Sequence, residues 1–156
     1  MGTDVTPQQR RLGAVEPEVL MSESEANALF DDIRADAVHM DETAVGMAAK
    51  MAKARDGGAW KVAGYDSWSQ CIQEEFGWSR AYGNRLAKYG EWALSIMEAS
   101  GGAIGASDVQ KALPEGRFRD LPKETLAEVP GAVEGAVKGK HAKNRPEAAV
   151  KAIADT

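Results

Sequence analysis

The chain has 156 residues, 44% of them hydrophobic, which predicts one modest core with terminal extensions. Its single cysteine, Cys71, excludes an internal disulfide, and its two histidines, His39 and His141, form no cluster with metal-ligand spacing. No apolar run approaches the length of a membrane span or a signal peptide, so we expect a cytoplasmic protein without membrane contact. The net charge of the chain is −5.

The negative charge is concentrated at the start of the chain. Residues 1–44 hold three Lys or Arg against ten Asp or Glu, a local charge of −7 (3 − 10). Residues 45–95 hold seven against five, or +2 (7 − 5), and residues 96–156 balance at nine against nine. Since Lys and Arg make the phosphate contacts that dominate nucleic-acid affinity, the overall charge does not exclude nucleic-acid binding by the later sections.

The N-terminal third predicts an arm followed by a long helix. Residues 1–21 show little periodicity and are expected to form a flexible arm. Ser22 and Glu25 have capping-box spacing, which predicts a helix start. Apolar residues then recur at heptad spacing, in a stripe that we call the heptad seam, up to the Gly57-Gly58 pair. The seam predicts one long helix whose apolar face packs on the rest of its own domain, with a dimeric coiled coil as the alternative. The seam consists of Phe30, Ile33, Ala37, Met40, Ala44, Met47, Met51 and Ala54.

Two shorter elements follow the glycine pair. Residues 59–65 predict a turn that packs Trp60 and Tyr65 into the core, with a brief strand as the alternative. Residues 66–92 then predict a helix-turn-helix, in which a first helix braces a second that reaches the major groove of DNA. The first helix is expected to end at Phe76, Gly77 closes it, and Ser79 caps a second helix that continues towards Met97.

Helical spacing assigns the faces of both helices. The residues expected to be buried are Trp68, Cys71, Ile72 and Phe76 on the first helix, and Trp78, Tyr82, Leu86 and Tyr89 on the second. Gly83 inside the second helix predicts a close approach, either to DNA or to the first helix.

The outward face of the second helix carries the candidate DNA-binding residues. Arg80 can donate two hydrogen bonds to guanine, and Asn84 can pair with adenine. Arg85 and Lys88 are expected to contact phosphates, and Ser79 can offer its hydroxyl or the amides of the helix start. The alternative interpretation is a solvated basic face on an ordinary helical hairpin.

The C-terminal third predicts a linker and short helices. Residues 100–106 form a glycine-rich linker by composition, and residues 107–156 a small helical region with pieces at 107–113, 122–129 and 146–154. Its basic segment is a possible second phosphate anchor, or else a solvated linker; the cationic residues are Lys138, Lys140, Lys143 and Arg145. No useful alternating strand pattern occurs, so the whole chain is expected to be all-α.

Residues 64–92 resemble a segment common in phage, plasmid and mobile-element proteins, with a helix-turn-helix related to that of the ParB and KorB class. The matching positions are Gly64-Tyr65, Ser67-Trp68, Gly77, Ser79-Arg80, Ala81-Tyr82 and Leu86. The resemblance implies that the helix opened by Ser79-Arg80 reads DNA. Residues 113–124 resemble the tail of such proteins more loosely, and nothing in the chain resembles the nucleotide-binding box of ParB proteins.

These features predict a sequence-specific double-stranded DNA-binding protein, a transcriptional regulator of a phage or mobile element. The long heptad helix would supply a homodimer that reads a palindromic site. The alternative is an interaction or inhibitor protein that binds a host protein through its acidic N-terminal third and methionine-rich helix. We do not expect an enzyme or a cofactor, because the sequence has no buried carboxylate pair, Ser-His arrangement or phosphate loop.

Overall fold

The computed structural model describes residues 19–38 and 40–156 of the chain. Within these ranges the structure consists of helices and connecting turns without any strand, which confirms the all-α prediction. The expected flexible arm lies outside the described residues except for its last three positions, and so does His39.

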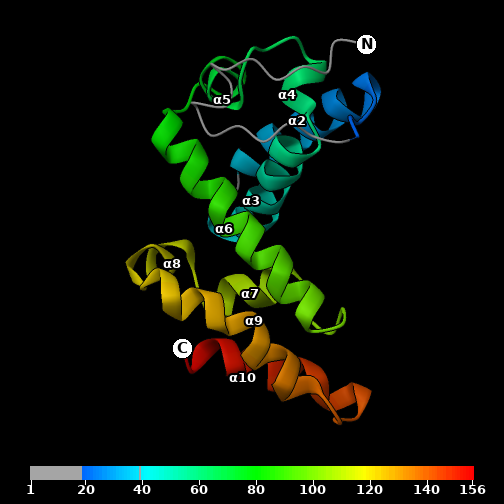
Figure 1. Ribbon diagram of the computed structural model, residues 1–156, viewed down its shortest axis with the longest axis vertical. Helices are drawn as coiled ribbons and strands as arrows, with labels where there is room; N and C mark the ends of the chain where they lie inside the picture. Colours follow the sequence, from blue (N-terminus) through cyan, green and yellow to red (C-terminus); the bar gives the residue numbers. More distant parts are fainter. Residues whose placement is uncertain (1–18, 39) are drawn as a thin grey trace.

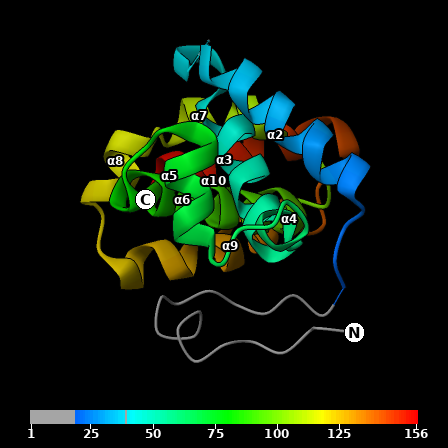
Figure 2. The ribbon, with the colours of Figure 1, turned by 90° about the horizontal axis from the view of Figure 1, so that it is seen from above.

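The predicted long helix is wrong: its segment forms two helices, α2 (Glu23–Val38) and α3 (Met40–Asp56), which pack side by side (Figures 1 and 2). They run antiparallel, because the amide of Met21 before α2 donates to the carbonyl of Gly57 after α3, at 3.1 Å. Further along the pair, Lys50 Nζ lies 2.6 Å from Asp36 Oδ2. The predicted cap is present, with the Glu25 amide donating to Ser22 Oγ at 3.1 Å.

Folding the segment back on itself turns the heptad seam inward. Phe30 and Ile33 of α2 and Met47, Met51 and Ala54 of α3 are all buried within the chain. A heptad pattern specifies which face is buried but not which surface covers it. These five seam residues are therefore covered by this chain itself and are not available to a coiled-coil partner.

The first hydrophobic cluster lies among α2, α3 and the next three helices. After Gly58 comes α4 (Ala59–Val62), which places Trp60 in the core, so residues 59–65 contain a short helix instead of a turn or strand. Tyr65 is only partly buried, and its hydroxyl donates to Glu75 at 3.4 Å. We call this group cluster A; its large members are Phe30, Ile33, Met47, Met51, Trp60, Trp68, Ile72 and Leu86.

Helix α5 (Trp68–Phe76) and the long helix α6 (Arg80–Ala99) follow, with the predicted boundaries at Phe76 and Ser79. Two glycines allow α6 to approach its neighbours closely. A Cβ atom at Gly83 would collide with the Ile72 side chain of α5, and one at Gly90 would collide with the Ala48 backbone of α3. The first contact decides between the two explanations predicted for Gly83: the close approach is to the first helix.

Four further helices and a 3₁₀ turn make up the C-terminal third. They are α7 (Ala106–Ala112), α8 (Glu115–Asp120), α9 (Lys123–Val137), η1 (Ala142–Asn144) and α10 (Arg145–Ala154). The predicted pieces 107–113 and 146–154 correspond to α7 and α10. Helix α9 is longer than the predicted 122–129, because it continues through Pro130.

A side chain of α6 compensates for this internal proline. Pro130 has no N–H to donate to the carbonyl of Leu126, the residue four positions earlier. Instead the indole Nε1 of Trp92 donates to that carbonyl at 3.0 Å. The bond provides a hydrogen-bond donor for the Leu126 carbonyl and joins α6 to α9.

The second half of α6 and the C-terminal helices form a second group, cluster B, together with Val45 and Ala48 of α3. Figure 1 shows α6 running diagonally from α5 in the upper part of the molecule to α7 and α9 in the lower part. The segment expected to be a linker is packed, since Ser100 is 1% exposed and Ile104 is 4% exposed. Residues 107–156 therefore share a core with α3 and α6.

Candidate nucleic-acid interface

The connection between α5 and α6 is short and held by backbone hydrogen bonds. Gly77 adopts φ 72°, a left-handed conformation that favours glycine, and its amide donates to Gln73 O at 3.1 Å. Ser79 caps α6, with its Oγ accepting from the Tyr82 amide at 3.1 Å. These bonds fix where α6 begins and leave Ser79 exposed at its N-terminus.

The outward face of α6 presents most of the predicted residues. Arg80 and Lys88 are exposed, and Asn84 between them is partly buried. Their four-residue spacing places the three side chains along one stripe of the helix. The stripe changes sign further along, where Glu91 is exposed and lies 3.2 Å from Arg55. The basic character is therefore confined to the first half of α6.

Arg85 differs from the other predicted residues because it already has partners within the chain. Its Nε lies 3.4 Å from Oε1 of Glu115, the first residue of α8, and its guanidinium carbon lies 5.5 Å from the centre of the Tyr82 ring. Its side chain is 40% exposed. A phosphate contact by Arg85 would have to compete with its contact to Glu115. We therefore place Arg85 at the edge of the basic face.

The aromatic residues at the turn are less buried than predicted. Phe76, Trp78 and Tyr82 are each partly exposed, whereas Leu86 and Tyr89 further along α6 are buried as expected. The three rings form a row against one another, with centroid distances of 5.2 Å for Phe76–Trp78 and 5.5 Å for Trp78–Tyr82. Helical spacing predicts which face of a helix is buried, but not how far along the helix the burial extends. Since α6 begins at the edge of cluster A, few side chains cover the rings in its first turn.

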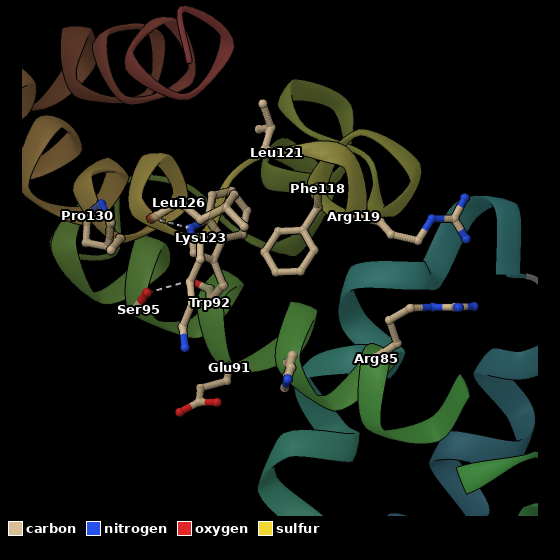
Figure 3. A pocket seen from close by; sticks show the side chains of 12 residues that line it. Arg85, Glu91, Trp92, Ser95, Phe118, Arg119, Leu121, Lys123, Leu126 and Pro130 are labelled. Atoms are coloured by element: carbon tan, nitrogen blue, oxygen red, sulfur yellow. Dashed lines mark hydrogen bonds between the residues drawn. The ribbon is translucent and has the colours of Figure 1, made fainter. Parts of the chain in front are cut away.

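Sequence reasoning missed the cations that α8 and α9 place next to α6. Arg119 and Lys123 line a groove that they share with Arg85 and Lys88, together with apolar side chains (Figure 3). The sequence signal was present in residues 113–124, which contain two prolines and three basic residues. These cations lie near α6 because α8 and α9 pack against it, and residue spacing along the chain does not reveal such packing between distant segments.

The basic segment 138–145 lies elsewhere. Lys138, Lys140, Lys143 and Arg145 are all exposed, and Arg145 Nε donates to the Lys140 carbonyl at 3.0 Å. Figure 1 places the end of α9 and the start of α10 at the opposite end of the molecule from the first turn of α6. The structure does not bring the two predicted groups of DNA contacts together.

The remaining candidate residues have structural surroundings. Cys71 is fully buried, and burial, with a smaller contribution from the charge of Glu75, raises the pKa of its thiol to about 12. His141 is exposed. Within the described ranges, no three or more His, Cys, Asp or Glu side chains gather in a way that could hold a metal ion. No helix in the described part of the chain is both long and apolar enough to cross a membrane.

The hypothesis of a host-protein interaction relies in part on the methionine-rich segment of α3. Met47 and Met51 are fully buried in cluster A, so these methionines are not available to a partner. Neither a family model, nor a curated protein, nor a solved structure matches this chain. The resemblance to the ParB and KorB helix-turn-helix therefore stays a prediction.

Proposed function

We propose that the protein binds double-stranded DNA in a sequence-specific manner, with α5 as the bracing helix and the first half of α6 as the reading helix. The observation that carries this proposal is the stripe of Arg80, Asn84 and Lys88, which begins at the exposed N-terminus of α6. Reading helices insert their N-terminal residues between the walls of the major groove, where such side chains can reach base edges.

The support of α6 suits this role. The contact between Gly83 and Ile72 holds α6 closely against α5, and Ser79 fixes its first turn. Arg80 can pair with guanine and Asn84 with adenine, while Lys88 and the first amides of α6 can bind phosphates. Arg85 can add a phosphate contact when it leaves Glu115.

We further propose that the DNA-bound species is a homodimer acting as a transcriptional regulator of a phage or mobile element. Two copies of α6 about one DNA turn apart would read a palindromic site. The contact between copies would need a surface other than the five seam residues that are buried within the chain, which are Phe30, Ile33, Met47, Met51 and Ala54. A basic face limited to half of one helix also favours two copies over one, since affinity grows with the number of phosphates contacted.

The decisive experiment is selection of bound duplexes from a random pool, followed by titration of the selected site across a salt series. The unmodified protein should bind with an affinity that falls as salt rises. Arg80→Ala should weaken binding by roughly 1–3 kcal/mol and relax the preference at one base pair. Lys88→Ala should weaken binding to all sequences about equally and lower the salt slope.

The matched control is Lys140→Ala with Lys143→Ala, which removes two charges at the far end of the molecule. This variant should retain the selected sequence preference. The proposal fails if the unmodified protein shows no salt-dependent duplex binding, or if the control variant loses the preference as fully as Arg80→Ala.

A further inference from the structure

A groove between α6, α8 and α9 has no role in the proposed reading of DNA bases. Its volume is about 680 Å³, within the range of small-molecule sites. Figure 3 shows Phe118 projecting into it from α8, with Trp92 below and Leu126 and Pro130 along α9. These apolar side chains form the floor of the groove.

The floor is held in place by contacts that do not depend on a ligand. The Trp92 indole donates to the Leu126 carbonyl at 3.0 Å. The Phe118 ring lies 5.3 Å from the Trp92 ring and 5.0 Å from the buried Tyr89 ring, centre to centre. A ligand would therefore meet a preformed apolar surface and would not have to order these side chains.

The rim of the groove is basic. Arg85 and Lys88 contribute from α6, and Arg119 and Lys123 from the α8–α9 segment. In Figure 3 the guanidinium groups of Arg85 and Arg119 extend in the same direction, beyond Phe118 and away from Trp92 and Pro130. Arg85 Nε lies 3.4 Å from Oε1 of Glu115, so Arg85 would have to leave that carboxylate to pair with a ligand. Glu91 also lines the groove, but its carboxylate points away from the floor and lies 3.2 Å from Arg55.

We propose that this groove binds a small organic anion with an aromatic or other bulky apolar body. The apolar floor would cover the body, and the cations of the rim would pair with a carboxylate, sulfonate or phosphate group. A volume of about 680 Å³ suits one such molecule. Binding itself does not depend on the proposed DNA function.

A consequence that does rest on the proposed function follows from the shared residues. Arg85 and Lys88 belong both to the rim and to the candidate DNA face. A bound anion would neutralise part of that face, so DNA and ligand should weaken each other's binding by the same factor. The groove would then be the effector site of a regulator.

The test uses two fluorescent probes with similar apolar bodies. One is the anion 8-anilinonaphthalene-1-sulfonate, and the other is neutral N-phenyl-1-naphthylamine. The folded full-length protein should bind the anion saturably at one site and more tightly than the neutral probe. Arg119→Ala with Lys123→Ala should weaken anion binding about tenfold, the size expected for losing charge-assisted contacts, and leave the neutral probe unaffected. Ala127→Trp should fill the groove and weaken both probes.

The matched control, Lys138→Ala with Lys140→Ala, removes two charges outside the groove and should leave both affinities unchanged. Circular dichroism verifies that each variant is folded. The proposal is overturned if binding of the anionic probe is not saturable, or if the control variant loses as much affinity for it as the groove variant. It is also overturned if the bound probe is displaced only by an acidic peptide or by self-association of the protein. No probe measurement involves DNA, so failure here is distinguishable from failure of DNA binding.

Discussion

The two halves of α6 differ in what covers them. The first half packs one face on cluster A, through Leu86 and the close contact at Gly83, and leaves its opposite face to solvent. The second half is held by α3 on one side and by the C-terminal helices on the other, through Tyr89, Trp92 and Ile96. A single helix can thus present a surface at one end while serving as a core element at the other.

This difference limits the candidate interface. Recognition of a groove needs an uncovered helix face, and only the first half of α6 has both exposure and basic residues. The second half gives that face its rigidity, because anchoring one end of a helix restricts how the other end can move. Four predictions test this division at neutral pH, beginning with the largest expected effect and ending with the smallest, and a fifth concerns alkaline pH.

The closest helix contact should be the most sensitive. Gly90→Ala places a Cβ on the Ala48 backbone of α3, which cannot rotate away as a side chain can. We expect a loss of about 3 kcal/mol or more in the free energy of unfolding, despite the better helix propensity of alanine. Urea unfolding followed by circular dichroism measures it.

Gly83→Ala is the comparison within the first half of α6. Its Cβ would meet the flexible Ile72 side chain, so we expect a smaller loss of roughly 1–2 kcal/mol. In an Ile72→Ala background, Gly83→Ala should reduce the free energy of unfolding by less than it does in the unmodified protein. No side-chain truncation should rescue Gly90→Ala in this way. Equal losses at the two glycines would contradict the assignment of backbone contact to α3 and side-chain contact to α5.

The bond between α6 and α9 predicts a rescue. Trp92→Phe removes the donor to the Leu126 carbonyl and should reduce the free energy of unfolding by about 1–3 kcal/mol. Pro130→Ala restores a backbone N–H four residues after Leu126. The double variant should therefore lose less than the sum of the two single variants, and strict additivity in unfolding experiments would contradict this role of Trp92.

The ion pair at the boundary of the two halves should matter little for stability. Glu115→Gln removes the partner of Arg85, whose side chain is 40% exposed, and we expect a change of about 0–1 kcal/mol. If Arg85 contacts phosphate, the same variant should tighten DNA binding, because Arg85 no longer has to leave a carboxylate. Weaker DNA binding by a folded Glu115→Gln variant would contradict that competition.

The ionisation of the buried Cys71 thiol should affect stability only at alkaline pH. Burial raises the pKa of Cys71 to about 12, above the ordinary thiol value of 9.0. The unfolded chain loses this proton first, so the stability contributed by the protonated thiol is fully present below pH 9 and is lost as pH rises towards 12. Cys71→Ala should flatten this part of the unfolding profile, and an unchanged slope would contradict the assignment.

Much of the local structure follows from sequence. The caps at Ser22 and Ser79 and the closing glycine at position 77 predict helix ends correctly, because capping depends on residues a few positions apart. The all-α class follows similarly from helical periodicity. Arg80 and Lys88 could be identified as exposed because their spacing opposes that of Leu86 and Tyr89 on the same helix.

Long-range packing was not accessible in the same way. The heptad seam looks the same in one long helix and in two that fold back, since either arrangement buries the same face. Helix α9 passes Pro130 because Trp92, thirty-eight positions earlier, supplies a donor, and propensity rules do not include such a partner. The contact of α8 with α6, which creates the groove, likewise depends on Tyr89, Trp92 and Phe118 meeting in space.

The packing of the glycine-rich connection after α6 affects how recombinant fragments should be designed. A fragment that stops at Ala99 would look like a complete DNA-binding unit, yet it would uncover Tyr89, Trp92 and Ile96, which the C-terminal helices bury. Such a fragment would aggregate more readily than the full chain, since large apolar patches promote association. The reading helix can therefore not be grafted as an independent module by cutting at this glycine-rich segment.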